Sequence, residues 1–251
     1  MAALLLARPG GSAGAPEAPR TLVSGTLRIG TYFVNPPFEY VANNGARVGF
    51  EVDLMGEIAR GLGLKAVFVN THWEAILQEL QGGRYDCIVG AITITPERER
   101  QLAWSVPYLT TTLSLVVNEA KTPGQRSLAD LRHGTVGVQA ATTDYDAALA
   151  MQRRGEIGRI KVYPFDRIEQ AMRDLEVGLI TAVMKIEPVA AWLAAKNPHL
   201  RILGQVPDHP QPLGIGFRKA ERALVAAIDR ALGAMQRDGS MDRLKAKWAV
   251  P

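Results

Sequence analysis

The sequence has few residues that build disulfides or metal centres. Cys87 is the single cysteine among 251 residues, so no internal disulfide can form. It lies in the apolar run YDCIVGA, where a small buried side chain is expected rather than a reactive thiol. The four histidines are far apart, and none has a second ligand at metal-binding spacing. We therefore expect neither a metal ion nor a cofactor.

Long apolar runs and charge clusters are also missing. No segment approaches the ~18 apolar residues of a membrane span. The 29 basic and 25 acidic residues leave a net charge of +4 that is scattered along the chain. A nucleic-acid-binding protein needs a concentrated basic face with aromatic residues, so we expect no nucleic-acid partner. A content of 47% hydrophobic and 22% charged residues is typical of a globular protein of one large domain or two lobes.

The first residues differ from the rest in composition. MAALLLARPGGSAGAPEAPR has an apolar core of about six residues, below the ~7 to 15 of a signal peptide, and no basic segment before it. Ala, Gly, Pro and Ser dominate residues 9–19. We expect residues 1–24 to be a flexible N-terminal segment or the remnant of a leader, outside the fold.

From Thr26 onward, strand-like and helix-like segments alternate. The first round predicts strands at 26–32, 65–70 and 85–93 and helices at 49–64 and 72–83. The second predicts strands at 135–140, 159–164 and 179–185 and helices at 142–155, 166–178 and 187–197. Asp166 and Glu169 fit a capping box at the start of one of these helices. Two similar α/β units in series imply two lobes.

Two extended segments connect these units. Residues 107–118 follow the first unit and residues 212–218 follow the second, before closing helices at 220–239 and 240–249. If these helices return to the first lobe, the chain crosses between lobes twice. We expect lobe 1 to comprise 25–111 and 212–251, and lobe 2 to comprise 112–211, with a hinge and a ligand cleft between them.

The segment GAITITPERER places Arg98 about one turn beyond the end of a strand. Sheets of this class bind ligands at that edge. A guanidinium there, with the Thr93 hydroxyl, suits a carboxylate, because the two groups match as a charge-assisted pair. The alternative is that Arg98 and Arg100 are both solvated helix residues.

Two further groups border the expected cleft. Thr142 and Thr143 follow a strand and begin a helix, where hydroxyls and free N–H groups favour an anion, although an ordinary helix cap explains them as well. Tyr32, Phe38 and Trp73 lie in strand-to-helix connections, either in the core or along the cleft. Trp73 is the best candidate for a cleft wall.

Five blocks of the chain carry a family resemblance. They are LRIGTYFVNPPFEY, VGFEVDLMGEIARGLGL, WEAILQELQGGRYDCIVGAITITPERERQLAWSVPY, TVGVQAATT and AIDRALGAMQRDGSMDRLKAKW. In order and spacing they resemble the periplasmic amino-acid-binding proteins of ABC importers, solute-binding protein family 3. The resemblance covers Thr26 to Trp248. It implies the α/β, two-lobed periplasmic-binding-protein type II fold, in which each lobe is an open, mostly parallel sheet with flanking helices and two strands form the hinge.

The resemblance also implies roles for individual residues. In that family an arginine matching Arg98 grips the ligand's α-carboxylate, and an aromatic residue at the Trp73 position packs against the ligand. The remaining parts of the grip match Thr93, the main chain at Ala91, Thr142 and Thr143. The family therefore implies a periplasmic or extracytoplasmic monomer without catalytic activity. Such a protein delivers an amino acid or small carboxylate to a membrane permease.

Departures from the family pattern change the expected ligand. Tyr32 and Asn35 stand where many relatives have an acidic residue and an aromatic one. The aspartate that takes the ligand's α-ammonium corresponds to Ile186, which cannot accept a hydrogen bond, and burying an unpaired cation costs several kcal/mol. We expect a carboxylate ligand without a conventional α-ammonium contact, unless Glu187 replaces the aspartate.

Lys185 precedes that position and has two interpretations. If it faces the cleft, it adds a second cation opposite Arg98, suited to a ligand with two acidic groups or with a polar far end. Alternatively, it pairs with Glu187 or Glu51 at the rim. Two other functions stay open: a cyclohexadienyl-dehydratase-like enzyme, whose general-acid glutamate corresponds to Val189 here, and a sensory ligand-binding domain.

Overall fold

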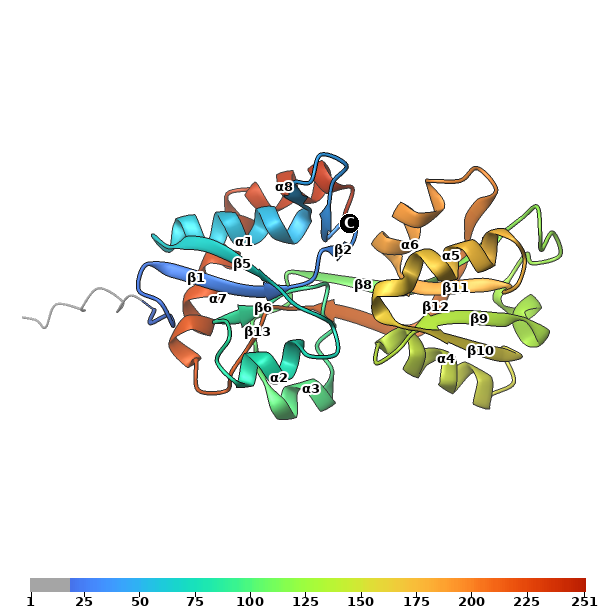
Figure 1. Cartoon of the computed structure of the whole chain (residues 1–251), viewed down its shortest axis with the longest axis horizontal. Helices are drawn as coiled ribbons and strands as arrows, with labels where there is room; N and C mark the ends of the chain where they lie inside the picture. Colours follow the sequence, from blue (N-terminus) through green and yellow to red (C-terminus); the bar gives the residue numbers. More distant parts are fainter. Residues whose placement is uncertain (1–18) are drawn as a thin grey trace, which may run out of the picture.

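The computed structural model describes residues 19–251; the expected leader segment lies mostly at positions 1–18, outside the described residues. Two five-stranded sheets form two lobes, arranged end to end in Figure 1, each with helices on both sides of its sheet. The alternating strands and helices predicted from the sequence are present in both lobes.

The first lobe has the strand order β5-β1-β6-β13-β7. Strands β1, β5 and β6 run parallel, and β13 joins β6 and β7 antiparallel. The strands are β1 (Thr26–Thr31), β5 (Lys65–Asn70), β6 (Cys87–Ile88), β7 (Ala103–Trp104) and β13 (Gly216–Phe217). A small second sheet comprises β2 (Val34–Asn35), β3 (Glu39–Val41) and β4 (Arg47–Val48). The helices are α1 (Phe50–Gly61), α2 (Ile76–Gln81), α3 (Pro96–Gln101), α7 (Arg222–Arg237) and α8 (Ser240–Trp248).

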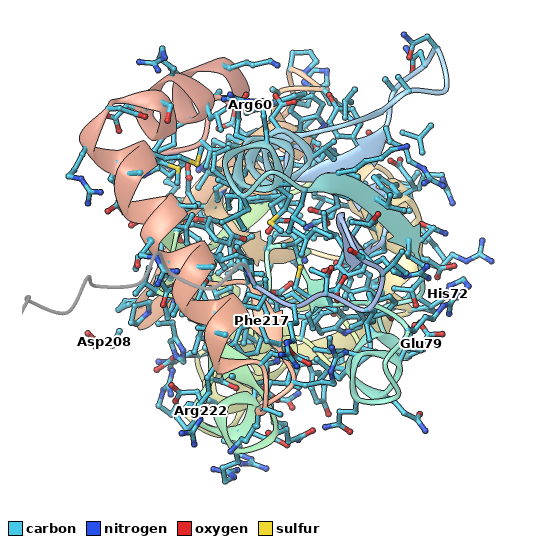
Figure 2. The ribbon with its side chains drawn as sticks, turned by 90° about the vertical axis from the view of Figure 1, so that its left-hand side faces the viewer. Arg60, His72, Glu79, Asp208, Phe217 and Arg222 are labelled. Carbon is cyan, nitrogen blue, oxygen red and sulfur yellow. The ribbon has the colours of Figure 1, made fainter. Side chains whose placement is uncertain are left out.

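Apolar periodicity places α1 against the first sheet. Phe50, Leu54 and Ile58 recur every fourth residue and are fully buried, each contributing about 1.5 to 3 kcal/mol on leaving water. Helices α7 and α8 pack against α1. Figure 2 shows this lobe end-on, with Phe217 inside it and the exposed Arg222 towards its outline.

The second lobe has the strand order β10-β9-β11-β8-β12. Strands β9, β10 and β11 are parallel, whereas β8 pairs antiparallel with β11 and β12. The strands are β8 (Leu109–Asn118), β9 (Thr135–Gln139), β10 (Arg159–Tyr163), β11 (Ala182–Ile186) and β12 (Leu200–Leu213). The helices are η1 (Leu128–His133), α4 (Thr143–Arg153), η2 (Phe165–Arg167), α5 (Ile168–Glu176) and α6 (Glu187–Ala194).

Strands β8 and β12 form the connection between the lobes. They pair from Leu109 with Leu213 to Thr112 with Pro210, and again beyond an irregularity that ends at Gln205. The chain enters β8 from β7 and leaves β12 for β13, which both belong to the first sheet. The chain therefore crosses between the sheets twice, although the lobe boundaries at 111/112 and 211/212 stay predictions.

One local prediction is wrong. Asp166 and Glu169 do not form a capping box, because residues 165–167 form the 3₁₀ turn η2 and α5 begins at Ile168. Arg167 precedes α5, and no side chain caps the helix. This turn carries Phe165 into the space between the lobes, which bears on the site.

Candidate functional site

A cavity of about 30 Å³ lies between the lobes, at the carboxyl ends of the parallel strands. The first lobe contributes Tyr32, Asn35, Trp73, Gly90, Ala91, Thr93 and Arg98, and the second Thr142, Thr143, Asp144, Phe165, Lys185 and Ile186. Every residue that the sequence singled out for ligand binding lines this cavity except Glu187.

Arg98 projects from α3 towards the cavity. Thr95 caps this helix by accepting a hydrogen bond from the Arg98 N–H, which fixes the turn. The guanidinium donates to the Thr93 carbonyl at 2.8 Å and lies 5.1 Å from the centre of a Trp73 ring. It forms no ion pair with any residue between 19 and 251, and burial lowers its pKa. The solvated alternative fits Arg100, which is exposed, but not Arg98.

Hydrogen bonds to buried side chains fix the main chain at Gly90 and Ala91. Ala91 has a left-handed backbone, with φ of 49°, and its N–H donates to Glu51 Oε1 at 2.9 Å. A side chain at Gly90 would meet the Tyr32 hydroxyl at 2.5 Å, and that hydroxyl donates to the Gly90 carbonyl. The Ala91 N–H is therefore committed to Glu51 and is not a free donor towards the cavity.

The threonine hydroxyls have partners within the protein. Thr142 caps α4 by accepting from the Tyr145 N–H, and its hydroxyl donates to the Gln139 carbonyl at 2.8 Å. Thr143 donates to Gln211 Oε1, also at 2.8 Å. Thr142 thus has the ordinary capping role that the sequence left open, while still lining the cavity.

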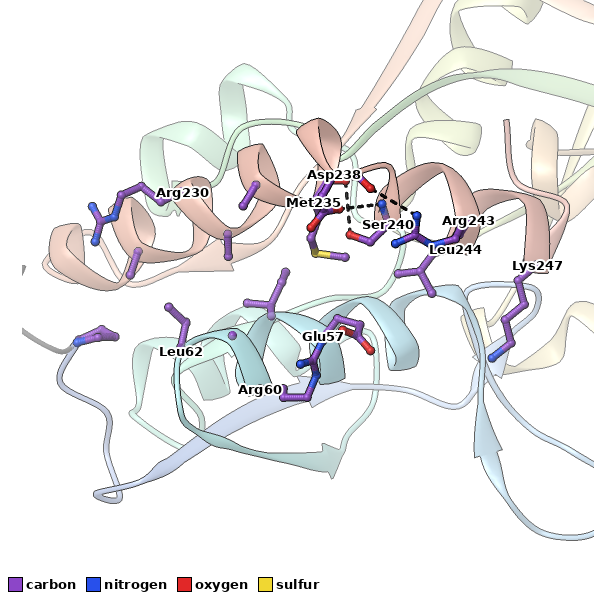
Figure 3. A pocket seen from close by; sticks show the side chains of 16 residues that line it. Glu57, Arg60, Leu62, Arg230, Met235, Asp238, Ser240, Arg243, Leu244 and Lys247 are labelled. Atoms are coloured by element: carbon purple, nitrogen blue, oxygen red, sulfur yellow. Dashed lines mark hydrogen bonds and ion pairs between the residues drawn. The ribbon is translucent and has the colours of Figure 1, made fainter.

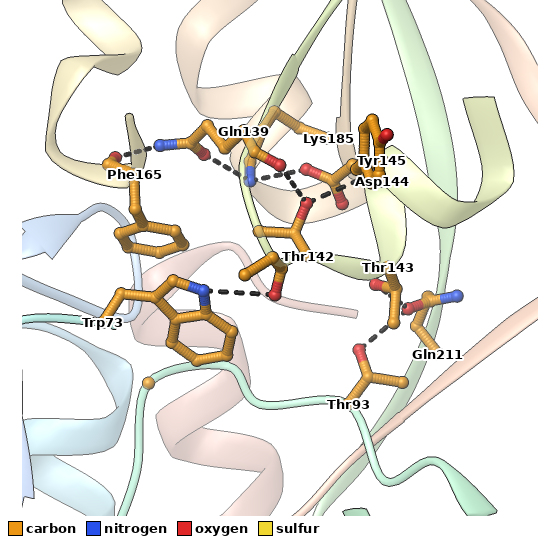
Figure 4. A network of polar contacts seen from close by, with 12 residues as sticks. Trp73, Thr93, Gln139, Thr142, Thr143, Asp144, Tyr145, Phe165, Lys185 and Gln211 are labelled. Carbon is orange, nitrogen blue, oxygen red and sulfur yellow. Dashed lines mark hydrogen bonds and ion pairs between the residues drawn. The ribbon is translucent and has the colours of Figure 1, made fainter. Parts of the chain in front are cut away.

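Lys185 lies in the cavity wall and is 5% exposed. Its ammonium donates to Asp144 Oδ2 and to Gln139 Oε1, each at 2.8 Å (Figure 4). Neither Glu187 nor Glu51, the partners considered from the sequence, forms this ion pair. The charge of Lys185 is therefore balanced by Asp144, and Lys185 is not a second free cation opposite Arg98.

Ile186 and Glu187 occupy different surroundings. Ile186 is buried and lines the cavity as the residue preceding α6. Glu187 is the first residue of α6, is partly exposed and does not line the cavity. Glu187 therefore does not take the place of the family's aspartate, which corrects its inclusion among the site residues.

Phe165 is a cavity residue that the sequence reasoning missed. Its ring stacks on Trp73 with centres 5.1 Å apart and meets Tyr32 edge-on at 4.7 Å. The Trp73 indole N–H donates across the cleft to the Ala141 carbonyl at 3.2 Å. An aromatic residue directly after a strand end was the available signal. Trp73 lines the cavity and also bridges the lobes, and its role as a wall against the ligand stays a prediction.

Two buried carboxyl groups lie behind the cavity. Glu39 and Glu51 are both fully buried. Burial, and then the charge of Glu51, raise the pKa of Glu39 well above its usual value. Because two nearby buried carboxylates repel each other, this environment favours the protonated form of Glu39. Tyr108 also donates to Glu51.

A larger cavity of about 920 Å³ lies away from the cleft, between α1 and the closing helices α7 and α8 (Figure 3). Its lining includes the apolar Ile58 and Leu244 and the basic Arg230 and Lys247. None of the residues predicted for ligand binding lines it. The larger cavity is therefore not the one lined by the predicted binding residues. Because polar groups from both lobes converge on the small cavity in the cleft, we take that cavity as the candidate ligand site.

Among residues 19–251, no group of three or more histidine, cysteine or acidic side chains is arranged to hold a metal ion. No helix in that range is long and apolar enough to cross a membrane.

Residues 27–251 match the model of the bacterial extracellular solute-binding proteins, family 3. The chain belongs to this family. It is 30% identical over 225 residues to the L-cystine-binding protein TcyJ of Escherichia coli (strain K12), covering 89% of this chain and 82% of that protein. It is 26% identical over 226 residues to ABC transporter arginine-binding protein 1 of the same strain, covering 88% and 90%.

Solved structures agree with this membership. An ancestral arginine-binding protein bound to arginine has a TM-score of 0.81 and 33% identity, covering 89% of this chain and 98% of that one. An ancestral amino acid-binding protein, a precursor of cyclohexadienyl dehydratase, has a TM-score of 0.79 and 32% identity, covering 89% and 95%. The type II periplasmic-binding-protein fold is confirmed. The two relatives named above are amino-acid-binding proteins, and one of them carries the name of an ABC transporter.

Proposed function

We propose that this family member captures a small carboxylate in the interlobe cavity, as an extracytoplasmic monomer, and delivers it to the membrane permease of an ABC importer. The observation that carries the proposal is Arg98, a largely buried guanidinium at the cavity without an ion-pair partner among residues 19–251. A carboxylate supplies the missing charge and accepts the guanidinium's free N–H groups.

The charges around the cavity favour a ligand with one negative group. Among the lining residues between 19 and 251, Asp144 supplies the one carboxylate, and it is already paired with Lys185. Arg98 then leaves one positive charge in excess. This balance argues against the two-acid ligand that a free Lys185 had suggested.

Ile186 argues that the ligand lacks a conventional α-ammonium. Its apolar side chain borders the cavity where an acceptor for the ammonium is needed. The stacked rings of Trp73 and Phe165 add apolar surface for the ligand's body.

One observation favours a second candidate, an α-amino acid whose ammonium replaces Lys185 as the partner of Asp144. The carboxylate of Asp144 lines the cavity, and relatives named for arginine and cystine bind amino acids. A dehydratase is less favoured, because Val189, the position of its general acid, cannot transfer a proton.

Thermal unfolding with a matched panel tests the proposal. L-arginine, L-cystine and L-histidine are compared with acids of the same skeleton that lack the α-amino group, and with amides that lack the carboxylate. We expect the deaminated acids to raise Tm most and the amides to have no effect. Equal stabilisation by amides would overturn the Arg98 assignment, whereas preference for the amino acids would establish the second candidate.

A further inference from the structure

Gln211 lies on one of the two strands that link the lobes, and its side chain forms hydrogen bonds with residues of both lobes. It lies on β12, opposite Thr111 of β8, just after the irregular stretch that ends at Pro210. The side chain is buried, with 4% of the residue exposed. A buried amide needs hydrogen-bond partners, and those of Gln211 belong to different lobes.

Two threonine hydroxyls donate to the same oxygen of Gln211. Thr93 Oγ1 of the first lobe and Thr143 Oγ1 of the second each lie 2.8 Å from Gln211 Oε1 (Figure 4). The amide nitrogen donates to the His209 carbonyl at 3.2 Å. That third bond sets the orientation of the amide, since the nitrogen has an acceptor and the oxygen has two donors.

We infer that Gln211 is a positioning residue that holds the lobes together across the anion site, by accepting hydrogen bonds from one threonine of each lobe. This inference rests on the proposed function for its consequence on ligand binding, but not for its effect on closure. Moving the lobes apart separates the two hydroxyls, so one side-chain amide cannot keep both bonds in an open cleft. The contact therefore stabilises the closed arrangement selectively.

The arrangement also limits how a carboxylate is bound. Each hydroxyl has one proton, and Thr93 and Thr143 give theirs to Gln211. Towards the cavity both oxygens then offer lone pairs, which repel a carboxylate and accept from a ligand hydroxyl or amine. Arg98 is left as the principal donor to the carboxylate, while the threonines select for a donor group elsewhere on the ligand.

A distance measurement between the lobes tests the closure step without a ligand. Spin labels at Lys65→Cys in the first lobe and Val177→Cys in the second use exposed positions, and the native Cys87 is buried. We expect Gln211→Leu to shift the distance distribution towards longer separations. Gln205→Leu is the matched control, a substitution of an exposed glutamine on the same strand. Identical distributions for Gln211→Leu and the unsubstituted protein would overturn the inference.

A second variant separates closure from charge and remains informative if Gln211→Leu does not fold. Gln211→Glu keeps an oxygen acceptor for both hydroxyls but adds a negative charge beside the Thr93 and Arg98 pair. We expect its closed population to be kept, and its affinity for a carboxylate ligand to fall about tenfold. A loss of closure in Gln211→Glu would contradict the acceptor role. If closure behaves as expected but no carboxylate binds the unsubstituted protein, the proposed function fails and the closure role stands.

Discussion

Lys185 and Asp144 form a buried ion pair across the second lobe, with Nζ 2.8 Å from Oδ2 and the two side chains 6% and 3% exposed. The pair joins the end of β11 to the first turn of α4, so it fixes the part of the lobe that faces the cleft. A charged side chain at this depth requires a partner of opposite charge. Because Asp144 neutralises Lys185, neither charge is left unpaired for a ligand.

Removing one member of this pair should be costly. We expect Lys185→Met to lower the free energy of unfolding by about 3 to 5 kcal/mol, because Asp144 is left buried without its counter-charge. The double variant Lys185→Met with Asp144→Leu should recover much of the loss. Urea unfolding measures both. Lys161→Met, in a more exposed pair with Asp174, is the control and should cost no more than about 1 kcal/mol. Equal losses at Lys185 and Lys161 would refute the buried-pair account.

Arg98 should dominate affinity for the ligand's carboxylate. We expect Arg98→Ala to weaken binding of the best carboxylate from the thermal panel by about 100-fold, since a charge-assisted pair in a largely buried cavity is lost. Arg98→Lys should keep the charge and still bind weakly, because it lacks the forked donor geometry. Titration calorimetry gives the dissociation constants. Arg100→Ala, on the exposed side of the same helix, should bind as the unsubstituted protein does.

Ile186 should control discrimination against the α-ammonium. Ile186→Asp places a carboxylate where the cavity is now apolar, so we expect it to shift preference from the deaminated acid towards the matching amino acid by at least tenfold. Ile186→Asn, which adds polarity without charge, is the control. The ratio of the two dissociation constants is the measurement. No change in that ratio would show that the ammonium, if present, lies elsewhere.

Glu39 should make stability depend on pH. Its folded pKa is raised by burial, and then by the charge of Glu51, so between its unfolded pKa of about 4.5 and the higher folded value the native state holds a proton that the unfolded state has lost. Its stabilising contribution is therefore full below pH 4.5 and declines as pH rises through that window, by up to about 1.4 kcal/mol per pH unit.

Glu39→Gln, which keeps a neutral donor, tests this dependence. We expect the difference in unfolding free energy between Glu39→Gln and the unsubstituted protein to move in favour of the variant as pH rises from 5 to 8. Unfolding curves in urea at each pH provide the values. A difference that does not vary with pH would mean that Glu39 is already ionised in the folded protein.

Much of the fold is readable from the sequence because apolar periodicity is strong along both α/β units. Helix α1 is predicted by the four-residue spacing of Phe50, Leu54 and Ile58, and the short apolar strands follow in the expected order. The start of α5 was misplaced because Asp166 and Glu169 have the right spacing for a capping box, whereas the chain forms a 3₁₀ turn there. Local spacing does not reveal which of two competing turns the surrounding packing selects.

Part of the candidate site could likewise be predicted from the sequence, and part could not. Arg98, Trp73 and the threonines follow strand ends, so topology alone brings them together. Asp144 and Gln211 were missed because their partners come from distant parts of the chain: Lys185 lies on β11, and the donors to Gln211 come from both lobes. Spacing along the sequence cannot predict a contact between residues that are brought together only when the chain crosses twice between the two sheets.

The double crossing also sets the order in which the lobes can be completed. Strand β13 lies between β6 and β7 in the first sheet, but it follows β12 in the chain. The second lobe has all five of its strands once residue 213 is available. The first lobe, although it begins earlier, must wait for Gly216 and Phe217 to close its sheet and for α7 and α8 to cover α1. During synthesis, the lobe that starts first is therefore the one that finishes last.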